Sequence, residues 1–131
     1  MAKKKAKKAS EKAVETCILT YLNYLPKCFA WKNNSTGVYD PSRGCFRKSK
    51  NRFAINGVSD ILGIYHGRFL AIEVKRATGG RTSKEQYDYI ERIKKLGGIA
   101  GVCTSVDEAK ELIKESGGFV DERSNIEGVS E

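Results

Sequence analysis

Hydrophobic residues recur at helical spacing in three segments of the chain. The first predicted helix has Ser10 as a suitable N-cap, runs to about Tyr24 and is closed by Pro26. Glu15 lies at the edge of its apolar face. The residues predicted to form the buried stripe of this helix are Val14, Cys17, Ile18, Tyr21, Leu22 and Leu25.

Capping-box patterns open the other two predicted helices, one at Thr82-Ser-Lys-Glu85 and one at Ser105-Val-Asp-Glu108. The first of these helices is expected to reach about Leu96 before the helix stop Gly97, and the second to end at Gly117-Gly118. Gln86, Ile90 and Ile93 are expected to share one face of the first of these helices. In the second, the residues expected to face inward are Val106, Ala109, Leu112 and Ile113.

Short apolar runs between the helices predict β-strands. Phe29-Ala30-Trp31 is expected to be a short strand, and residues 99–103 another. Residues 60–65 and 68–75 flank His66-Gly67, a two-residue turn sequence typical of a β-hairpin. The order α, weak β, β, β, α, β, α therefore predicts an α/β domain with a mixed sheet flanked by helices.

The length of 131 residues is typical of a single domain. We expect the domain to cover residues 10–116, between a basic flexible tail over residues 1–9 and an acidic flexible tail over residues 117–131. Residues 33–52, rich in Asn, Ser, Gly, Pro and Arg, predict a long loop or a poorly paired hairpin. A loop of this length in a compact domain is usually functional.

The formal net charge of +8 comes wholly from the first part of the chain, in two clusters of basic residues. One cluster is Lys3, Lys4, Lys5, Lys7 and Lys8; the other is Arg43, Arg47, Lys48, Lys50 and Arg52, with Phe46 and Phe53 among them. Such clusters suit a polyphosphate partner, because each neutralised phosphate releases condensed counterions. A solubilising tail and a solvated loop are the alternative interpretations.

Several function classes lack sequence support. No apolar run spans a bilayer and no secretory signal begins the chain, so we expect a soluble, intracellular protein without a membrane partner. The four cysteines form no C-x-x-C pair and His66 is the only histidine, so the usual zinc sites are not expected. Neither a phosphate-binding loop nor a dinucleotide fingerprint occurs, so no nucleotide cofactor is expected.

The predicted hairpin brings two carboxylates together. With His66-Gly67 as the loop, Asp60 pairs across the strands with Glu73, and Lys75 shares the same face. Two opposed carboxylates among apolar neighbours repel each other, and a divalent cation offsets that repulsion. Magnesium or manganese bound by Asp60, Glu73 and a backbone carbonyl would support phosphodiester hydrolysis, with Lys75 orienting or deprotonating the attacking water.

These residues carry a resemblance to a known family. Gly57-Val58-Ser59-Asp60 followed by Glu73-Val74-Lys75 resembles the signature of PD-(D/E)xK nucleases, with Ser59 where that signature names proline. Together with Glu15 on the first helix and Gln86 at the start of the second, roughly residues 10–115 resemble the virus-type replication-repair nuclease (VRR-NUC) domain.

The resemblance implies a restriction-endonuclease-like core of four strands flanked by helices. It implies a metal held by Asp60, Glu73 and the Val74 carbonyl, with Glu15 and Gln86 as accessory carboxylate and glutamine. It also implies DNA cleavage, and small stand-alone members from phages and bacteria resemble junction-resolving homodimers. The expected function is therefore a Mg²⁺- or Mn²⁺-dependent endodeoxyribonuclease in the cytoplasm of a bacterium or phage host, acting on branched DNA such as four-way (Holliday) junctions in replication, repair or recombination.

Alternatives stay open from the sequence. Gln86 fits a helix cap through Ser83-x-x-Gln86, and Glu15 fits an ordinary surface carboxylate. A non-catalytic nucleic-acid-binding protein and an RNA-cutting nuclease with the same core are the rival functions. The residues expected to contact nucleic acid are Arg43, Arg47, Lys48, Lys50, Arg52, Arg81 and Lys84.

Overall fold

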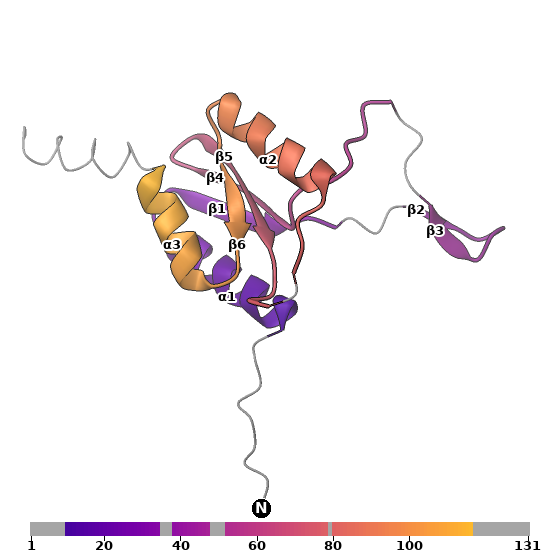
Figure 1. The fold of residues 1–131 in the computed structure, drawn as a ribbon, viewed down its shortest axis with the longest axis horizontal. Helices are drawn as coiled ribbons and strands as arrows, with labels where there is room; N and C mark the ends of the chain where they lie inside the picture. Colours follow the sequence, from indigo (N-terminus) through magenta and orange to yellow (C-terminus); the bar gives the residue numbers. More distant parts are fainter. Residues whose placement is uncertain (1–9, 35–37, 48–51, 79, 117–131) are drawn as a thin grey trace, which may run out of the picture.

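The computed structural model describes residues 10–34, 38–47, 52–78 and 80–116 (Figure 1). The main sheet has the strand order β1-β4-β5-β6, in which β5 and β6 run parallel and the other neighbours antiparallel. The predicted α/β class with a mixed four-stranded sheet is therefore confirmed. In chain order the elements are α1 (Glu11–Tyr24), β1 (Cys28–Lys32), β2 (Val38–Asp40), β3 (Cys45–Arg47), β4 (Ile61–Tyr65), β5 (Arg68–Val74), α2 (Lys84–Lys95), β6 (Ile99–Cys103) and α3 (Val106–Glu115).

Helices cover the main sheet on both faces, with α1 and α3 on one face and α2 on the other (Figure 1). The larger core lies under α1 and α3, where alternate strand residues such as Leu70 and Ile72 pack against Ile18 and Leu22. A smaller cluster lies under α2 and contains Ala71, Tyr89, Ile90 and Ala100. Helix α2 packs on β5 and β6. A hydrogen bond joins its first turn to the end of β5, and the candidate site described below lies there.

The first helix agrees with its predicted bounds. Ser10 is the N-cap, and its hydroxyl accepts a hydrogen bond from the Ala13 N–H at 3.1 Å. The buried stripe is narrower than predicted, because Cys17 is exposed. Cys17 lies at the edge of the apolar face, whereas Val14, Ile18 and Leu22 point into the core.

The β4–β5 hairpin has the predicted register, from Tyr65 paired with Arg68 to Ile61 paired with Ile72. His66 has φ 50° and so adopts the left-handed conformation that a tight two-residue turn requires. The ladder ends at the Ile61 pair, so Asp60 lies in the bend just before β4 rather than inside the strand.

The segment expected to be a long loop contains a second, two-stranded sheet. Strands β2 and β3 pair with each other, with Tyr39 opposite Phe46, and not with the main sheet. In Figure 1 this hairpin stands apart from the body of the molecule. The expectation of a loop or weak hairpin is thus refined to a short, separate hairpin.

Two expected details of the capping boxes differ in the structure. The N-cap of α2 is Ser83 rather than Thr82, because the reciprocal bonds form between Ser83 and Gln86. In α3, Ser105 caps the helix as expected, but the Glu108 carboxylate bonds to Thr104 instead of completing a box. The predicted helix end at residues 117–118 and the two predicted tails lie outside the described residues.

Candidate active site

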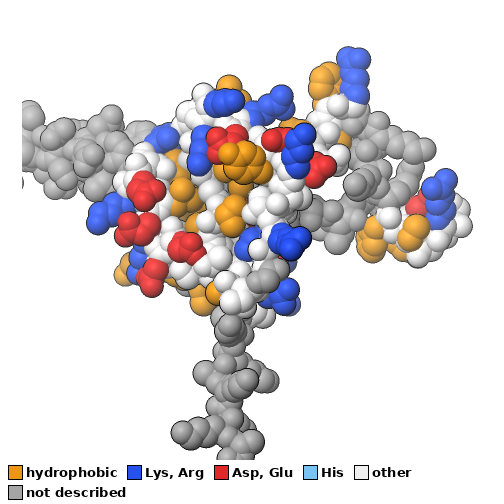
Figure 2. All heavy atoms as spheres, viewed as in Figure 1, with side chains coloured by type: hydrophobic (Ala, Val, Ile, Leu, Met, Phe, Trp, Pro, Cys, Tyr) orange, Lys and Arg blue, Asp and Glu red, His pale blue; other side chains and the backbone are white. Residues whose placement is uncertain are grey.

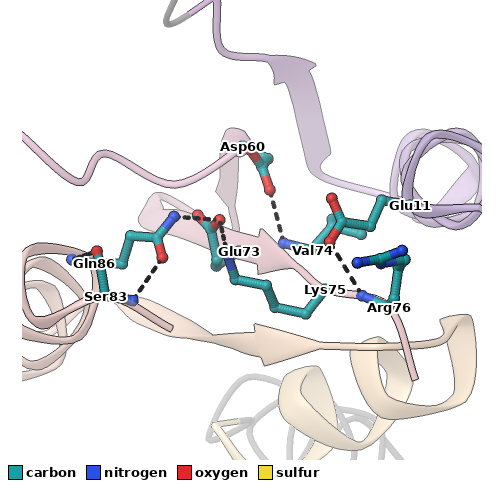
Figure 3. Close-up of polar contacts among 8 residues, drawn as sticks. All are labelled: Glu11, Asp60, Glu73, Val74, Lys75, Arg76, Ser83 and Gln86. Atoms are coloured by element: carbon teal, nitrogen blue, oxygen red, sulfur yellow. Dashed lines mark hydrogen bonds and ion pairs between the residues drawn. The ribbon is translucent and has the colours of Figure 1, made fainter. Parts of the chain in front are cut away.

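Asp60 is held in place from both sides. Its backbone carbonyl accepts a hydrogen bond from the Asn33 N–H at 2.7 Å, just beyond β1. Its Oδ2 accepts one from the Val74 N–H at 3.0 Å (Figure 3). The carboxylate therefore satisfies a backbone donor at the end of β5, which the sheet ladder leaves open there.

The turn before Asp60 packs directly on the start of α2. Gly57 has φ 79°, and a Cβ built there would lie 2.6 Å from the backbone nitrogen of Gln86. Only glycine fits both the conformation and the space. This contact fixes the Asp60 turn against the helix that carries Gln86.

Glu73 is a buried carboxylate at the centre of the site, with only 2% of its surface exposed. Its Oε1 accepts a hydrogen bond from Gln86 Nε2 at 2.7 Å and lies 3.4 Å from Lys75 Nζ (Figure 3). Its Oε2 is buried without a hydrogen-bond partner in the described part of the chain. A buried polar atom left without a partner is costly, so this oxygen is the most unusual atom of the site.

The electrostatic environment raises the pKa of Glu73 from its ordinary value of 4.5 to about 7. Burial is the main cause, because it penalises the charged form, and the neighbouring Asp60 carboxylate adds to it. The Lys75 ammonium acts in the opposite direction and does not cancel the other two effects. The two carboxylates thus interact strongly, as the hairpin register predicts.

Gln86 has both of the roles that its sequence context allows: it caps a helix and it contacts the site. Its side-chain oxygen accepts the Ser83 N–H at 2.9 Å and so completes the capping box of α2. Its side-chain nitrogen donates to Glu73. A single amide thereby fixes the first turn of α2 and the Glu73 carboxylate in one arrangement.

Lys75 follows β5 and shares the face of Glu73, as the alternation of strand side chains predicts. Its side chain is 16% exposed, so the ammonium is largely shielded from solvent. The backbone on either side of it is anchored: the Lys75 N–H donates to Cys103, and the Arg76 N–H donates to Glu11 Oε1 at 3.3 Å. The role of Glu11 was not anticipated from the sequence, where it is visible only as an acidic residue in the first helical turn.

The structure does not bring Glu15 into this group. Its carboxylate lies 3.3 Å from the ammonium of Lys32, at the end of β1. No three His, Cys, Asp or Glu side chains in the described ranges lie close enough to hold a metal ion. Glu15 is thus paired with a lysine on the edge strand and, among the described residues, completes no three-carboxylate site with Asp60 and Glu73.

The residues expected to contact nucleic acid fall into two regions. Arg81 and Lys84 are exposed at the start of α2, close in sequence to Gln86. Arg43 and Arg52 are exposed on or near the β2–β3 hairpin. Lys48 and Lys50 lie outside the described residues, and of Arg47 only the backbone is described.

A groove of about 600 Å³ lies elsewhere, between β5 and α2. It is lined by Phe69, Ile93 and Leu96, near the start of β5 and the end of α2. Glu73 and Gln86 lie at the opposite ends of these two elements. The site therefore lies at the C-terminal end of β5 and is not part of this apolar groove.

No protein-family model matches the chain, and neither does any curated protein. Among solved structures, a protein titled "VRR_NUC domain protein" superposes with a TM-score of 0.56. The two are 20% identical, and the match covers 82% of this chain and 88% of the other. The chain has a VRR-NUC-like fold. The fold expected from the resemblance is therefore confirmed, and in this VRR-NUC-like fold the Gly57–Asp60 turn and the end of β5 meet at the first turn of α2.

No helix in the part of the chain that the structure describes is long and apolar enough to cross a membrane.

Proposed function

We propose that this protein is a nuclease of the PD-(D/E)xK type that hydrolyses phosphodiester bonds in DNA with the help of a divalent cation. The observation that carries the proposal is the environment of Glu73: a buried carboxylate beside Asp60 and Lys75, with one oxygen that has no partner in the described residues. Perturbed carboxylates of this kind are typical of functional sites. The VRR-NUC-like fold supports the same reaction class.

The donor atoms fit a hard cation. Glu73 Oε2 is buried and has no hydrogen-bond partner among the described residues, and Asp60 places a second carboxylate beside it. Two carboxylates and a backbone carbonyl, for which Val74 is the candidate, are the oxygen ligands that Mg²⁺ and Mn²⁺ prefer. When bound, such an ion neutralises phosphate charge and lowers the pKa of a coordinated water.

Other groups of the protein have the remaining roles in the reaction. Val74 N–H fixes the Asp60 carboxylate, and Gln86 fixes that of Glu73. In hydrolysis a water oxygen bonds to phosphorus, one ester P–O bond breaks, and the leaving oxygen takes a proton. We propose that the Lys75 ammonium, held by Glu73, orients that water and stabilises the charge that develops on the phosphoryl oxygens.

The test is a cleavage assay on DNA in Mg²⁺ or in EDTA. Asp60→Asn, Glu73→Gln and Lys75→Ala should each reduce cleavage by about 100-fold or more, because each removes charge at the reacting centre. Glu91→Gln is the control: Glu91 forms an exposed ion pair with Lys94, so its removal should leave cleavage unchanged. DNA binding in EDTA should survive in all four variants.

Three outcomes would contradict the proposal. Cleavage by the three site variants at the wild-type rate would show that the site is not catalytic. Binding without cleavage in every metal would instead indicate a non-catalytic nucleic-acid-binding protein. Faster cutting of the RNA version of one substrate would assign the same residues to an RNA-cutting nuclease.

We extend the proposal to branched DNA cut by a homodimer, which rests on the resemblance to small junction-resolving members of the family. The edge strand β1 adds an observation in its favour, since it exposes the neighbouring rings of Phe29 and Trp31, whose centroids are 5.4 Å apart. A second copy would cover this apolar surface. Light scattering should give the mass of a dimer, and four-way DNA should be cut faster than linear duplex; a monomer with equal rates would refute the extension.

A further inference from the structure

The β2–β3 hairpin carries an aromatic pair that the core does not use. Tyr39 and Phe46 are cross-strand partners, and their ring centroids are 5.3 Å apart in an edge-to-face arrangement. The two residues are 53% and 59% exposed. Neither belongs to a buried cluster, and Figure 1 shows the hairpin apart from the helices and the main sheet.

Exposed aromatic rings on a projecting hairpin need an explanation. A cross-strand aromatic pair stabilises a hairpin by roughly 1 kcal/mol or less, but that role does not require both rings to remain more than half exposed. Aromatic side chains with open faces are the usual platforms on which nucleobases stack. The pair is therefore suited to a flat, apolar ligand group.

The surroundings of the pair are basic. Residues 38–53 contain five Lys or Arg residues and one acidic residue, Asp40. Among the described side chains of the hairpin, Arg43 is 74% exposed. Further along the chain, the guanidinium of Arg52 lies 4.8 Å from the ring centre of Phe53. Figure 2 shows basic and hydrophobic side chains together on this hairpin. Such a surface complements a chain that alternates phosphates with flat bases.

The Arg43 side chain is available to a phosphate. Its Nε lies 3.9 Å from Asp40 Oδ2, a distance at the limit of an ion pair, and the side chain is mostly in solvent. Exposed pairs of this kind contribute little free energy, so a phosphate can replace the carboxylate at small cost. Asp40 itself is engaged by Ser42, whose N–H and hydroxyl both donate to it.

We propose that the β2–β3 hairpin is a DNA-binding element that selects unpaired nucleotides, with Tyr39 and Phe46 stacking on bases and Arg43 contacting a flanking phosphate. The identity of the ligand as DNA rests on the proposed nuclease function. In continuous duplex the bases are already stacked on each other, so the rings reach them only where strands separate. The element therefore adds a preference for branched, gapped or single-stranded sites to the reaction at Glu73.

The experiment measures binding in EDTA, so that cleavage plays no part. The probe is a DNA oligonucleotide with 2-aminopurine in an unpaired gap, compared with the same sequence fully paired. Tyr39→Ala/Phe46→Ala should weaken binding of the gapped DNA about tenfold, which equals about 1.4 kcal/mol and lies within the range for stacking on one base. Binding of the paired DNA should change less than twofold, and the quenching of 2-aminopurine by the wild type should be lost in the variant.

Two sets of control variants separate stacking from loss of structure. Tyr39→Phe/Phe46→Tyr keeps both rings and should bind like the wild type, whereas Tyr39→Leu/Phe46→Leu keeps the apolar bulk and should not. Tyr24→Ala removes a ring that is 89% exposed at the end of α1, and it should leave binding unchanged. The melting temperature of every variant should lie within a few degrees of that of the wild type, because the pair stabilises the hairpin by only roughly 1 kcal/mol or less.

The outcomes are distinguishable from those of the nuclease assay. Equal loss for gapped and paired DNA, full binding by the leucine variant, or tighter binding of the RNA version of the gapped probe would overturn the inference. Each of these results leaves metal-dependent cleavage intact. Selective binding without any cleavage would support the hairpin's role and contradict the nuclease proposal.

Discussion

At the scale of single residues, the site contains groups whose burial or backbone conformation costs free energy. Glu73 is buried with a raised pKa, and Gly57 has a left-handed backbone in direct contact with α2. Ser59, between them in the chain, is fully buried and its hydroxyl has no partner in the described residues. These features persist because the turn before Asp60 is held by the surrounding packing, and strain held in this way is typical of functional sites.

Gly57 provides a test of that packing. Gly57→Ala should destabilise the protein by roughly 3 kcal/mol, from overpacking added to the cost of a left-handed residue. It should also lower cleavage, because the new methyl group displaces the backbone of Gln86. Urea denaturation measures the first effect and a cleavage assay the second.

Gly67→Ala is the matched control for this prediction. Gly67 has φ 80°, close to the 79° of Gly57, but a Cβ there would meet nothing within 4 Å. Its substitution should therefore cost only the left-handed conformation, about 1–2 kcal/mol, and leave cleavage unchanged. Equal destabilisation by the two substitutions would show that the contact with α2 is unimportant.

At the scale of elements, the site lies where three pieces of secondary structure end. β4 begins one residue after Asp60, β5 ends one residue before Lys75, and α2 begins just before Gln86. Element ends have backbone donors that the regular ladder does not satisfy. Asp60 and Gln86 bind two of these donors, at Val74 and Ser83, and are thereby fixed in orientation.

The capping of α2 is predicted to matter for activity as well as stability. Ser83→Ala removes the hydroxyl that accepts the Gln86 N–H at 3.1 Å, and should cost about 1 kcal/mol. It should also lower cleavage severalfold, because Gln86 holds Glu73. Ser105→Ala removes the equivalent cap of α3 and should cost a similar amount without affecting cleavage. Equal cleavage by both variants would mean that Gln86 does not position the site.

At the scale of the whole molecule, the Glu73 carboxyl couples protonation to stability. Its pKa is about 7 in the folded protein and near 4.5 without the fold. Between these pH values the folded state binds a proton that the unfolded state has lost. The contribution of this carboxyl group to the free energy of unfolding is therefore fully present below about pH 4.5 and is lost as the pH rises through 7. Burial of this carboxyl at the candidate site therefore lowers the stability of the metal-free protein at neutral pH.

The expected result is that Glu73→Gln stabilises the metal-free protein at pH 8. The pKa rise corresponds to at most about 3 kcal/mol, at about 1.4 kcal/mol for each pKa unit. At pH 4.5 the variant and the wild type should be equally stable. The measurement is urea denaturation in EDTA across this pH range, with Glu91→Gln as the control. Parallel pH dependence of Glu73→Gln and wild type would contradict the assigned pKa.

Local patterns predicted most of the fold. The His66-Gly67 turn set the register of the central hairpin, and helical spacing after Ser10 set the first helix, because both depend on short-range backbone preferences. The same patterns were less accurate where two caps compete, as at Thr82 and Ser83. The choice between them depends on Gln86, whose side chain reaches both the cap and Glu73.

The sequence by itself determined the chain order of the helices and of the four main-sheet strands, the pairing that places Asp60 near Glu73, and the alternation that puts Lys75 beside it. These relations hold within one hairpin, so they follow from spacing along the chain. Only the tertiary structure decided which residues from distant parts of the chain contact this hairpin: α2 brings Gln86 to Glu73, and α1 brings Glu11 to Arg76. It also pairs Glu15 with Lys32, away from the site. The packing of helices on a sheet sets those contacts, and spacing along the chain does not encode it.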